Sequence, residues 1–309
     1  MVAAPAVPEG PTFAAYAAGW LDRSSMRWAP GGRTAHAASV QALTITLGMV
    51  IKKAAAENLV SAALWSGVGT TRVRQSVLSE VRQVPSPEEV VQVAEAIARR
   101  GPTSPATGRP RGDRLKAVVL LAGTSAPRPG EITGLRTADV FLDEEHPHIV
   151  VRQTLRWYPQ ADRARLGADT VPIGGGWASR PLKHRAPGIT RKVPIHPLAL
   201  PAMREHLERY AGPDLFFSRV LGDGPLDWGN VESAYWRPAC REVFVEGRAF
   251  LATMPPKTLR KAALTAMLAA GINPYVVAAI AGHDPATLMS SYAGVIDQRD
   301  VLRVWSRAS

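Results

Sequence analysis

Cysteine is almost absent from this sequence. Cys240 is the one cysteine among 309 residues, so no disulfide can form within the chain, and no group of cysteine and histidine residues has the spacing of a zinc site. We therefore expect a reducing, intracellular setting and no bound metal ion.

Long apolar runs are absent as well. The most apolar stretch, residues 38–51, is shorter than the roughly 18 residues that a membrane span requires, and Gln41, Thr44 and Thr46 interrupt it. Residues 1–10 are rich in proline and alanine and lack the basic and apolar parts of a signal peptide. These absences predict a cytoplasmic protein that does not associate with a membrane.

Positive charge, in contrast, is abundant. The chain has 37 lysine and arginine residues against 26 acidic residues, which gives a formal net charge of +11 and a pI near 10.3. Such a balance favours an anionic partner, most often a nucleic acid. The alternative is a basic globular protein whose arginine content follows genome composition. In either case, the hydrophobic fraction of 46% is that of a globular protein with a core.

The length of 309 residues suggests two domains, since one domain usually takes about 100–200 residues. Residues 101–112 are rich in proline and glycine and predict a basic linker. It would separate a helical N-terminal domain, residues 1–100, from a second domain with a C-terminal tail, residues 113–309. Residues 161–187 have a similar composition and predict a long loop inside the second domain.

Apolar residues recur mostly at the spacing of amphipathic helices. Alternating β-branched residues predict two short strands, at residues 148–156 and 190–195. The expected fold is mainly α with a small antiparallel β-sheet, an α+β protein. The predicted helices cover residues 13–21, 35–57, 70–82, 87–99, 114–123, 129–135, 197–210, 228–245, 256–270, 274–281 and 286–292.

The usual signatures of cofactor and hydrolase chemistry are missing. The glycines at 174–176 lack the strand–loop–helix context of a nucleotide-binding loop, and no Ser/His/Asp pattern is present. We therefore expect no cofactor. What remains is a set of basic residues, histidine and tyrosine at the boundaries of predicted elements.

Arg128 is the first of these boundary residues. A residue before proline is kept out of the helical region, and proline is favoured at the first helical position. Arg128 is therefore predicted to be the N-cap of a helix with Glu131 at the third position, where its charge suits the helix start. An arginine there can bind a phosphate, although by itself the pattern also fits a surface arginine in a turn.

Further candidates follow along the chain. Lys183 precedes the second predicted strand, in a place where most lysines are simply solvated. Lys257 and Arg260 share one face at the start of a helix and repel each other unless an anion lies between them. Gly282 and His283 fit a helix C-cap followed by a structural histidine as well as they fit a functional pair.

The spacing of these residues resembles that of the tyrosine recombinases (phage integrase family). Residues 255–295 resemble the C-terminal catalytic block of that family, with Arg260 and His283 23 positions apart and Tyr292 nine positions further on. Residues 128–140 resemble the first arginine box of the family. Lys183, ahead of residues 191–195, resembles the lysine of its β-hairpin. The resemblance covers about residues 114–292, and its four boxes stand in the family's order.

The resemblance implies an enzyme that cuts and rejoins DNA through a 3′-phosphotyrosyl intermediate without a metal ion. Tyr292 would be the nucleophile, because a phenolate can store the phosphodiester energy in a covalent bond. Arg128 and Arg260 would stabilise the anionic transition state. Lys183 would protonate the departing 5′ oxygen, and His283 would donate a hydrogen bond to the phosphate.

Two positions in the catalytic blocks depart from the family pattern. Lys257 stands where the family usually has histidine, and we expect it to donate a hydrogen bond to the phosphate as part of the catalytic set. Ala126 and Pro127 stand where a glycine and an apolar residue are commoner. Residues 12–21 resemble the start of the family's DNA-binding, core-binding domain, but this domain is shortened here.

The implied partners are double-stranded DNA and further copies of the chain, as a homo-tetramer on paired sites, with the protein associated with the nucleoid. Residues 297–307 would pack on a neighbouring protomer or, alternatively, on their own domain. Two other functions stay open. One is a type IB topoisomerase-like activity, and the other is a recombinase-derived DNA-binding protein with impaired catalysis.

Overall fold

The computed structural model describes residue 48, residues 51–53 and 55–57, and residues 84–292 except 164, 165, 184 and 223. The side chains of residues 161, 162 and 290–292 also lie outside the description. The chain divides into two compact units, Met1–Gln75 and Ser76–Ser309. In the first unit, residues 51–53 are helical. The helices predicted at 13–21 and 70–82, most of the one at 35–57, and the tail at 297–307 lie outside the described residues.

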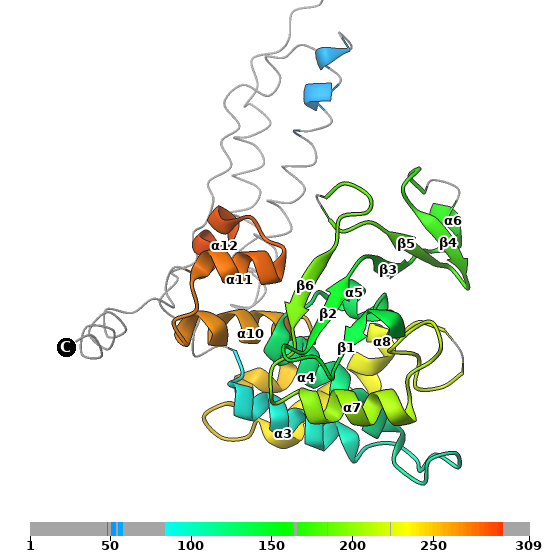
Figure 1. Ribbon diagram of the computed structural model, residues 1–309, viewed down its shortest axis with the longest axis vertical. Helices are drawn as coiled ribbons and strands as arrows, with labels where there is room; N and C mark the ends of the chain where they lie inside the picture. Colours follow the sequence, from blue (N-terminus) through cyan, green and yellow to red (C-terminus); the bar gives the residue numbers. More distant parts are fainter. Residues whose placement is uncertain are drawn as a thin grey trace, which may run out of the picture. The chain divides into compact units, whose positions relative to one another are not determined.

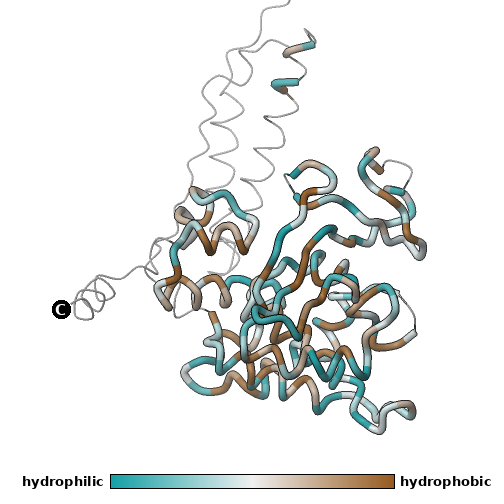
Figure 2. The backbone as a smooth tube through the Cα atoms, viewed as in Figure 1, coloured by the Kyte–Doolittle hydropathy of each residue, from teal (hydrophilic) through white to brown (hydrophobic). Residues whose placement is uncertain are grey.

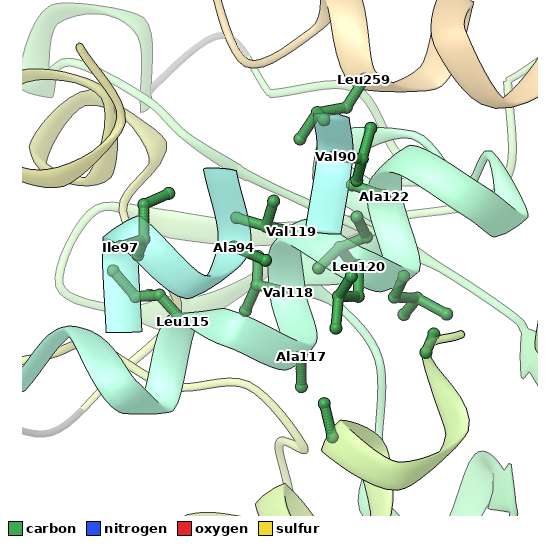
Figure 3. Packing of buried hydrophobic residues seen from close by; sticks show 14 of the residues in the cluster. Val90, Ala94, Ile97, Leu115, Ala117, Val118, Val119, Leu120, Ala122 and Leu259 are labelled. Atoms are coloured by element: carbon green, nitrogen blue, oxygen red, sulfur yellow. The ribbon is translucent and has the colours of Figure 1, made fainter. Parts of the chain in front are cut away.

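The core of the second unit forms around α4 (Lys116–Ser125), from which every residue after Lys116 is buried. Helix α3 (Pro87–Ala98) begins with the predicted capping box, in which Ser86 and Glu89 exchange hydrogen bonds of 2.7 and 3.2 Å. Its apolar face packs on α4 (Figure 3). The contact is close at Gly123, where a Cβ would lie 2.5 Å from Val90 Cγ1.

This packing corrects the predicted domain boundary. Helix α3 shares one core with α4, because its apolar face has to be buried against another element, so residues 101–112 lie inside the second unit. The backbone of Gly112 is packed on α3, since a Cβ there would lie 2.0 Å from the Ile97 carbonyl oxygen. A short 3-10 helix, Arg111–Leu115, then leads into α4. The boundary between the units falls before α3, after Gln75.

Two small antiparallel sheets lie beside this helical core (Figure 1). The first has the order β1 (Val140–Phe141), β2 (His148–Val151) and β6 (Arg191–Pro194). The second has the order β3 (Thr154–Trp157), β5 (Trp177–Arg180) and β4 (Val171–Gly174).

The sheets differ from the sequence prediction in two ways. The strand predicted at 148–156 is broken at Arg152 and Gln153, whose side chains donate to Asp139 Oδ1 (2.6 Å) and to the Gly134 carbonyl (3.1 Å). The segment predicted as a loop, residues 161–187, contains the β4–β5 hairpin. Helix α6 (Gln160–Arg163) covers the first residues of this segment. Three consecutive glycines, residues 174–176, make the hairpin turn with positive φ angles that suit glycine.

Most of the predicted helices are confirmed. Figure 2 shows apolar and polar residues alternating along them, as amphipathic helices require. None of the described helices is long and apolar enough to cross a membrane. The fold class is α+β, mainly helical. The remaining elements are α5 (Pro129–Thr133), a 3-10 turn (Thr137–Asp139), α7 (Leu200–Arg209), α8 (Trp228–Asn230), a π-helical segment (Val231–Trp236), α9 (Arg237–Val243), a 3-10 turn (Ala249–Thr253), α10 (Thr258–Ala269), α11 (Pro274–Ala281) and α12 (Pro285–Tyr292).

One buried histidine of this core makes the stability of the protein depend on pH. His206 in α7 is 3% exposed, and its Nε2 donates to the Phe216 carbonyl at 2.9 Å. Burial, together with the positive charge of Arg114, lowers the pKa of His206 from 6.5 to about 4.

We predict that the free energy of unfolding falls as the pH is lowered from 6.5 to 4. In this range the unfolded chain binds a proton on His206 while the folded chain does not, and the full shift corresponds to about 3 kcal/mol. The variant His206→Gln keeps a donor for Phe216 but cannot titrate, so its urea midpoint should change less between pH 7 and pH 4.5. Equal pH dependence in both proteins would contradict the assignment.

Candidate active site

The site begins where α4 ends. Ala126 follows this helix with a φ of 61°, the only positive φ of a non-glycine residue in the described part of the chain. Arg128 is extended, and α5 begins at Pro129, as the sequence predicts. Glu131 at the third helical position accepts a hydrogen bond from the Arg128 backbone N–H at 2.7 Å. This short turn therefore fixes the backbone of Arg128.

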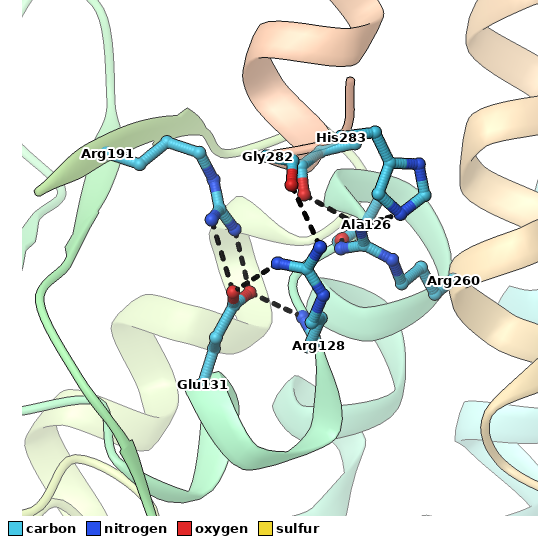
Figure 4. A network of polar contacts seen from close by, with 8 residues as sticks. Ala126, Arg128, Glu131, Arg191, Arg260, Gly282 and His283 are labelled. Atoms are coloured by element: carbon cyan, nitrogen blue, oxygen red, sulfur yellow. Dashed lines mark hydrogen bonds and ion pairs between the residues drawn. The ribbon is translucent and has the colours of Figure 1, made fainter. Parts of the chain in front are cut away.

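The carboxylate of Glu131 is completely buried and binds two guanidinium groups (Figure 4). Arg128 Nη1 donates to its Oε1 at 2.9 Å, and Arg191 from β6 donates to both oxygens at 3.1 and 2.7 Å. Burial raises the pKa of Glu131, but the hydrogen bonds and charges of Arg191 and Arg128 outweigh this effect and hold the pKa below its ordinary value. Glu131 is therefore an ionised carboxylate between two arginines.

A third guanidinium reaches the same place from the first turn of α10. Arg260 donates to the carbonyl oxygens of Ala126 and Ala281, the second at 2.6 Å, and its Nη2 lies 2.9 Å from His283 Nε2. Burial, together with the positive charges of Arg260, Arg128 and Arg191, lowers the pKa of His283 to about 4. His283 is therefore neutral at pH 7, with Nε2 as the acceptor and the proton on Nδ1.

The turn between α11 and α12 completes the cluster. Gly282 caps α11 in the left-handed conformation, with a φ of 63°, and its carbonyl oxygen accepts from Arg128 Nη2 at 2.9 Å. A Cβ on this residue would lie 2.6 Å from Arg191 Nη1. Two helix C-caps, at residues 126 and 282, thus supply carbonyl oxygens to the arginines that flank them.

A cavity of about 780 Å³ adjoins this cluster. Arg128 lines it from one side, and Lys183, in the turn between β5 and β6, lines it as well. Trp228 anchors the floor of the cavity by donating from Nε1 to the Pro129 carbonyl at 3.1 Å. Arg156, Arg180 and Arg185 add positive charge to its walls.

The structure therefore places Arg260 in contact with His283 and bonds Arg128 to the carbonyl of the adjacent Gly282. Lys183 lines a cavity that it shares with Arg128. Lys257 is exposed and directly precedes α10. Tyr292 is the last residue of α12, and its side chain lies outside the described part of the chain.

Glu131 and Arg191 are additions to the residues selected from the sequence. Glu131 was expected only as a capping residue, whereas it also joins two arginines. Arg191 occupies an inward position of β6, where alternate residues are buried and exposed. A charged residue at an inward strand position needs a buried partner of opposite charge, and this is the signal that the sequence offered.

The electrostatics of the cluster suit an anion. Three arginines carry three positive charges against the one negative charge of Glu131, which leaves a formal charge of +2 with His283 neutral. A phosphodiester in the adjoining cavity would offset part of this charge, and guanidinium groups are suited to its oxygens.

No protein-family model matches the sequence, and a search of curated proteins finds no match. Solved structures do resemble it. A Tn1549 transposon integrase in complex with a circular intermediate DNA superposes with a TM-score of 0.62 at 14% identity, over 98% of this chain and 87% of that chain. A lambda integrase dimer bound to a COC′ core site superposes with a TM-score of 0.54 at 16% identity, over 94% of this chain and 82% of that chain.

The fold is that of the tyrosine recombinases. The resemblance found in the sequence motifs is thereby confirmed for the architecture. The four boxes contribute residues from segments that are distant in the sequence. They are Arg128 at the N-cap of α5, Lys183 before β6, Arg260 in α10 and His283 after α11.

We predict that Gly282→Ala destabilises the protein more than Gly271→Ala. Both glycines have positive φ angles, 63° and 78°, so either alanine costs about 1–2 kcal/mol of backbone strain. Only at residue 282 does the new Cβ also meet Arg191, because nothing lies within 4 Å of a Cβ at residue 271. The free energies of unfolding in urea should differ accordingly. Equal losses would show that Arg191 can move aside freely.

Proposed function

We propose that this chain is a site-specific DNA recombinase of the integrase type, which cuts and rejoins DNA through a 3′-phosphotyrosyl intermediate. The observation that supports this best is the meeting of Arg128, Arg260 and His283, from three distant segments, beside a cavity that also contains Lys183. The two integrases with the same fold were both solved with DNA. The net charge of +11 fits such a partner.

In the proposed reaction the Tyr292 oxygen attacks the scissile phosphorus, and the bond to the 5′ oxygen breaks. Lys183 gives a proton to this leaving oxygen, and Arg128 and Arg260 stabilise the charge that builds on the non-bridging oxygens. His283 donates a hydrogen bond to the phosphate from its imidazole ring. The 5′ hydroxyl of a second strand then attacks the phosphotyrosine and releases the tyrosine.

The proposed assembly is a homo-tetramer on paired DNA sites, with residues 297–307 packing on a neighbouring copy. A second candidate function is DNA binding with impaired catalysis. It is favoured by Lys257, which stands at the place of the family's histidine and is exposed at the start of α10. The two functions differ in whether a covalent complex with DNA forms.

We predict that the protein forms a covalent adduct with a nicked suicide substrate and that Tyr292→Phe abolishes the adduct while DNA binding is retained. Only one hydroxyl is removed, so phosphate contacts by the basic residues should persist. Tyr275→Phe is the matched control, because Tyr275 in α11 is 73% exposed and should be dispensable. Adduct formation is read from denaturing gels and binding from mobility shifts. An adduct that survives in Tyr292→Phe would assign the nucleophile elsewhere, and wild-type binding without an adduct would favour the second function.

We also predict that Lys257→Ala slows adduct formation by about one to two orders of magnitude. This corresponds to the loss of one charged hydrogen-bond donor, about 1.5–3 kcal/mol. The variant Lys257→His should recover much of the rate at acidic pH and lose part of it above pH ~7, because histidine loses its charge with a pKa of ~6.5. Single-turnover rates across this pH range are the measurement. An alanine variant as fast as the wild type would leave Lys257 as a solvated residue at a helix start.

A further inference from the structure

Arg191 is a buried arginine to which the proposed reaction assigns no role. Its side chain is 6% exposed, and β6 turns it inward while the adjacent Lys192 faces outward. Both terminal nitrogens donate to Glu131, and its Nε has no partner in the described part of the chain. A buried ion pair is seldom more stable than a well-packed apolar pair, so stability alone explains this arrangement poorly.

Glu131 is saturated because of Arg191. Its Oε1 accepts from Nη1 of Arg128 and Nη1 of Arg191, and its Oε2 accepts from the backbone N–H of Arg128 and Nη2 of Arg191. Four donors fill about four acceptor positions, which is the full capacity of a carboxylate. Without Arg191 two of these positions become vacant, and the carboxylate gains freedom to rotate away from Arg128.

Arg191 also lies against the turn that contains His283. The Arg191 Nη1 atom leaves no space for a Cβ on Gly282, whose carbonyl oxygen binds Arg128. In the chain, Arg191 follows Lys183 by eight residues and begins the strand into which the Lys183 turn leads. The Arg191 side chain therefore contacts the segments that hold Arg128 and His283, and its backbone continues the segment that holds Lys183.

We propose that Arg191 is a positioning residue for DNA cleavage: it clamps Glu131 so that the Arg128 guanidinium faces the phosphate, and it fixes the Gly282–His283 turn. This inference rests on the proposed function. Arg191 is not a catalytic residue, because it is buried and, within the described part of the chain, its side chain donates only to Glu131. Its contribution reaches the phosphate only through Arg128 and His283.

The arrangement gives Arg191 an effect on pH dependence that a purely structural residue would not have. Arg128 faces Glu131 from its own turn and Arg191 faces it from β6, while Arg260 of α10 and His283 after α11 adjoin Arg128. In Arg191→Gln, burial of Glu131 is opposed by Arg128 alone among these contacts, so the pKa of Glu131 rises. The cleavage rate should then fall on the acidic side, as Glu131 becomes protonated and releases Arg128.

The test compares single-turnover adduct formation at pH 5–9 for the wild type, Arg191→Gln and Arg191→Lys at saturating protein. Arg191→Gln should be about 10- to 100-fold slower, equivalent to one hydrogen-bonded charge, and should show the new acidic limb. Arg191→Lys should recover part of the rate, because an ammonium keeps the charge but lacks the planar fork that fits both oxygens. Lys192→Gln removes a neighbouring exposed charge and should leave the rate unchanged.

A second readout does not depend on cleavage. Arg191 is one of the charges that lower the pKa of His283, so the NMR titration of the His283 ring should move to higher pH in Arg191→Gln, while that of His206 should not move. Circular dichroism establishes that each variant is folded. If Arg191→Gln does not fold, Arg191→Lys decides: a slower rate than the wild type supports the proposal, and the wild-type rate overturns it.

The outcomes separate this inference from the proposed function. A folded Arg191→Gln variant that cleaves at the wild-type rate would overturn the inference, as would one that is slowed equally at every pH with an unchanged His283 titration. A wild-type protein that forms no adduct would instead overturn the proposed function, and with it any role of Arg191 in cleavage.

Discussion

Among the described residues, the carboxylate of Glu131 is the negative charge that lies between the guanidinium groups of this site, and the site depends on it. Arg128, Arg191 and Arg260 come from the N-cap of α5, from β6 and from α10, and without a counter-charge their repulsion would oppose the packing of these elements. Breaking such a buried pair typically costs about 3–5 kcal/mol, because the remaining charges lose their compensation. Glu131 is itself held by the first turn of a five-residue helix, so a short local structure organises contacts between distant segments.

The backbone supplies the rest of the negative potential through two left-handed helix caps. Ala126 and Gly282 end α4 and α11, and each cap directs a carbonyl oxygen to an arginine. At residue 126 the methyl group of alanine is buried in an apolar cluster with Leu264 and Leu268, which offsets part of the strain of a positive φ. A glycine at residue 126 would lose this contact. At residue 282 Arg191 occupies the space that a methyl group would need, so only glycine fits.

The sequence was sufficient where local rules decide the structure. The capped start of α5 and the bounds of α11 follow from proline positions and apolar spacing, and the motif spacing singled out Arg128, Arg260 and His283, which the fold brings together. The sequence was insufficient where contacts between residues that are distant in the chain decide the structure. The break after β2 depends on acceptors at residues 134 and 139, and the domain boundary depends on the packing of α3 on α4. Arg191 could not be matched to Glu131, 60 residues earlier, because an inward arginine signals a partner without identifying it.

The electrostatics of the cluster also limit how protons can move in the proposed reaction. His283 is neutral, but its Nε2 lone pair is used by Arg260 and its Nδ1 carries the proton, so it cannot serve as a base. A lysine ammonium, as at residue 257, has donors and no acceptor. A phenol that enters this positively charged site is easier to ionise, since nearby positive charge favours the phenolate. The same arginines that stabilise the transition state would therefore also activate the nucleophile, and its proton would leave to solvent.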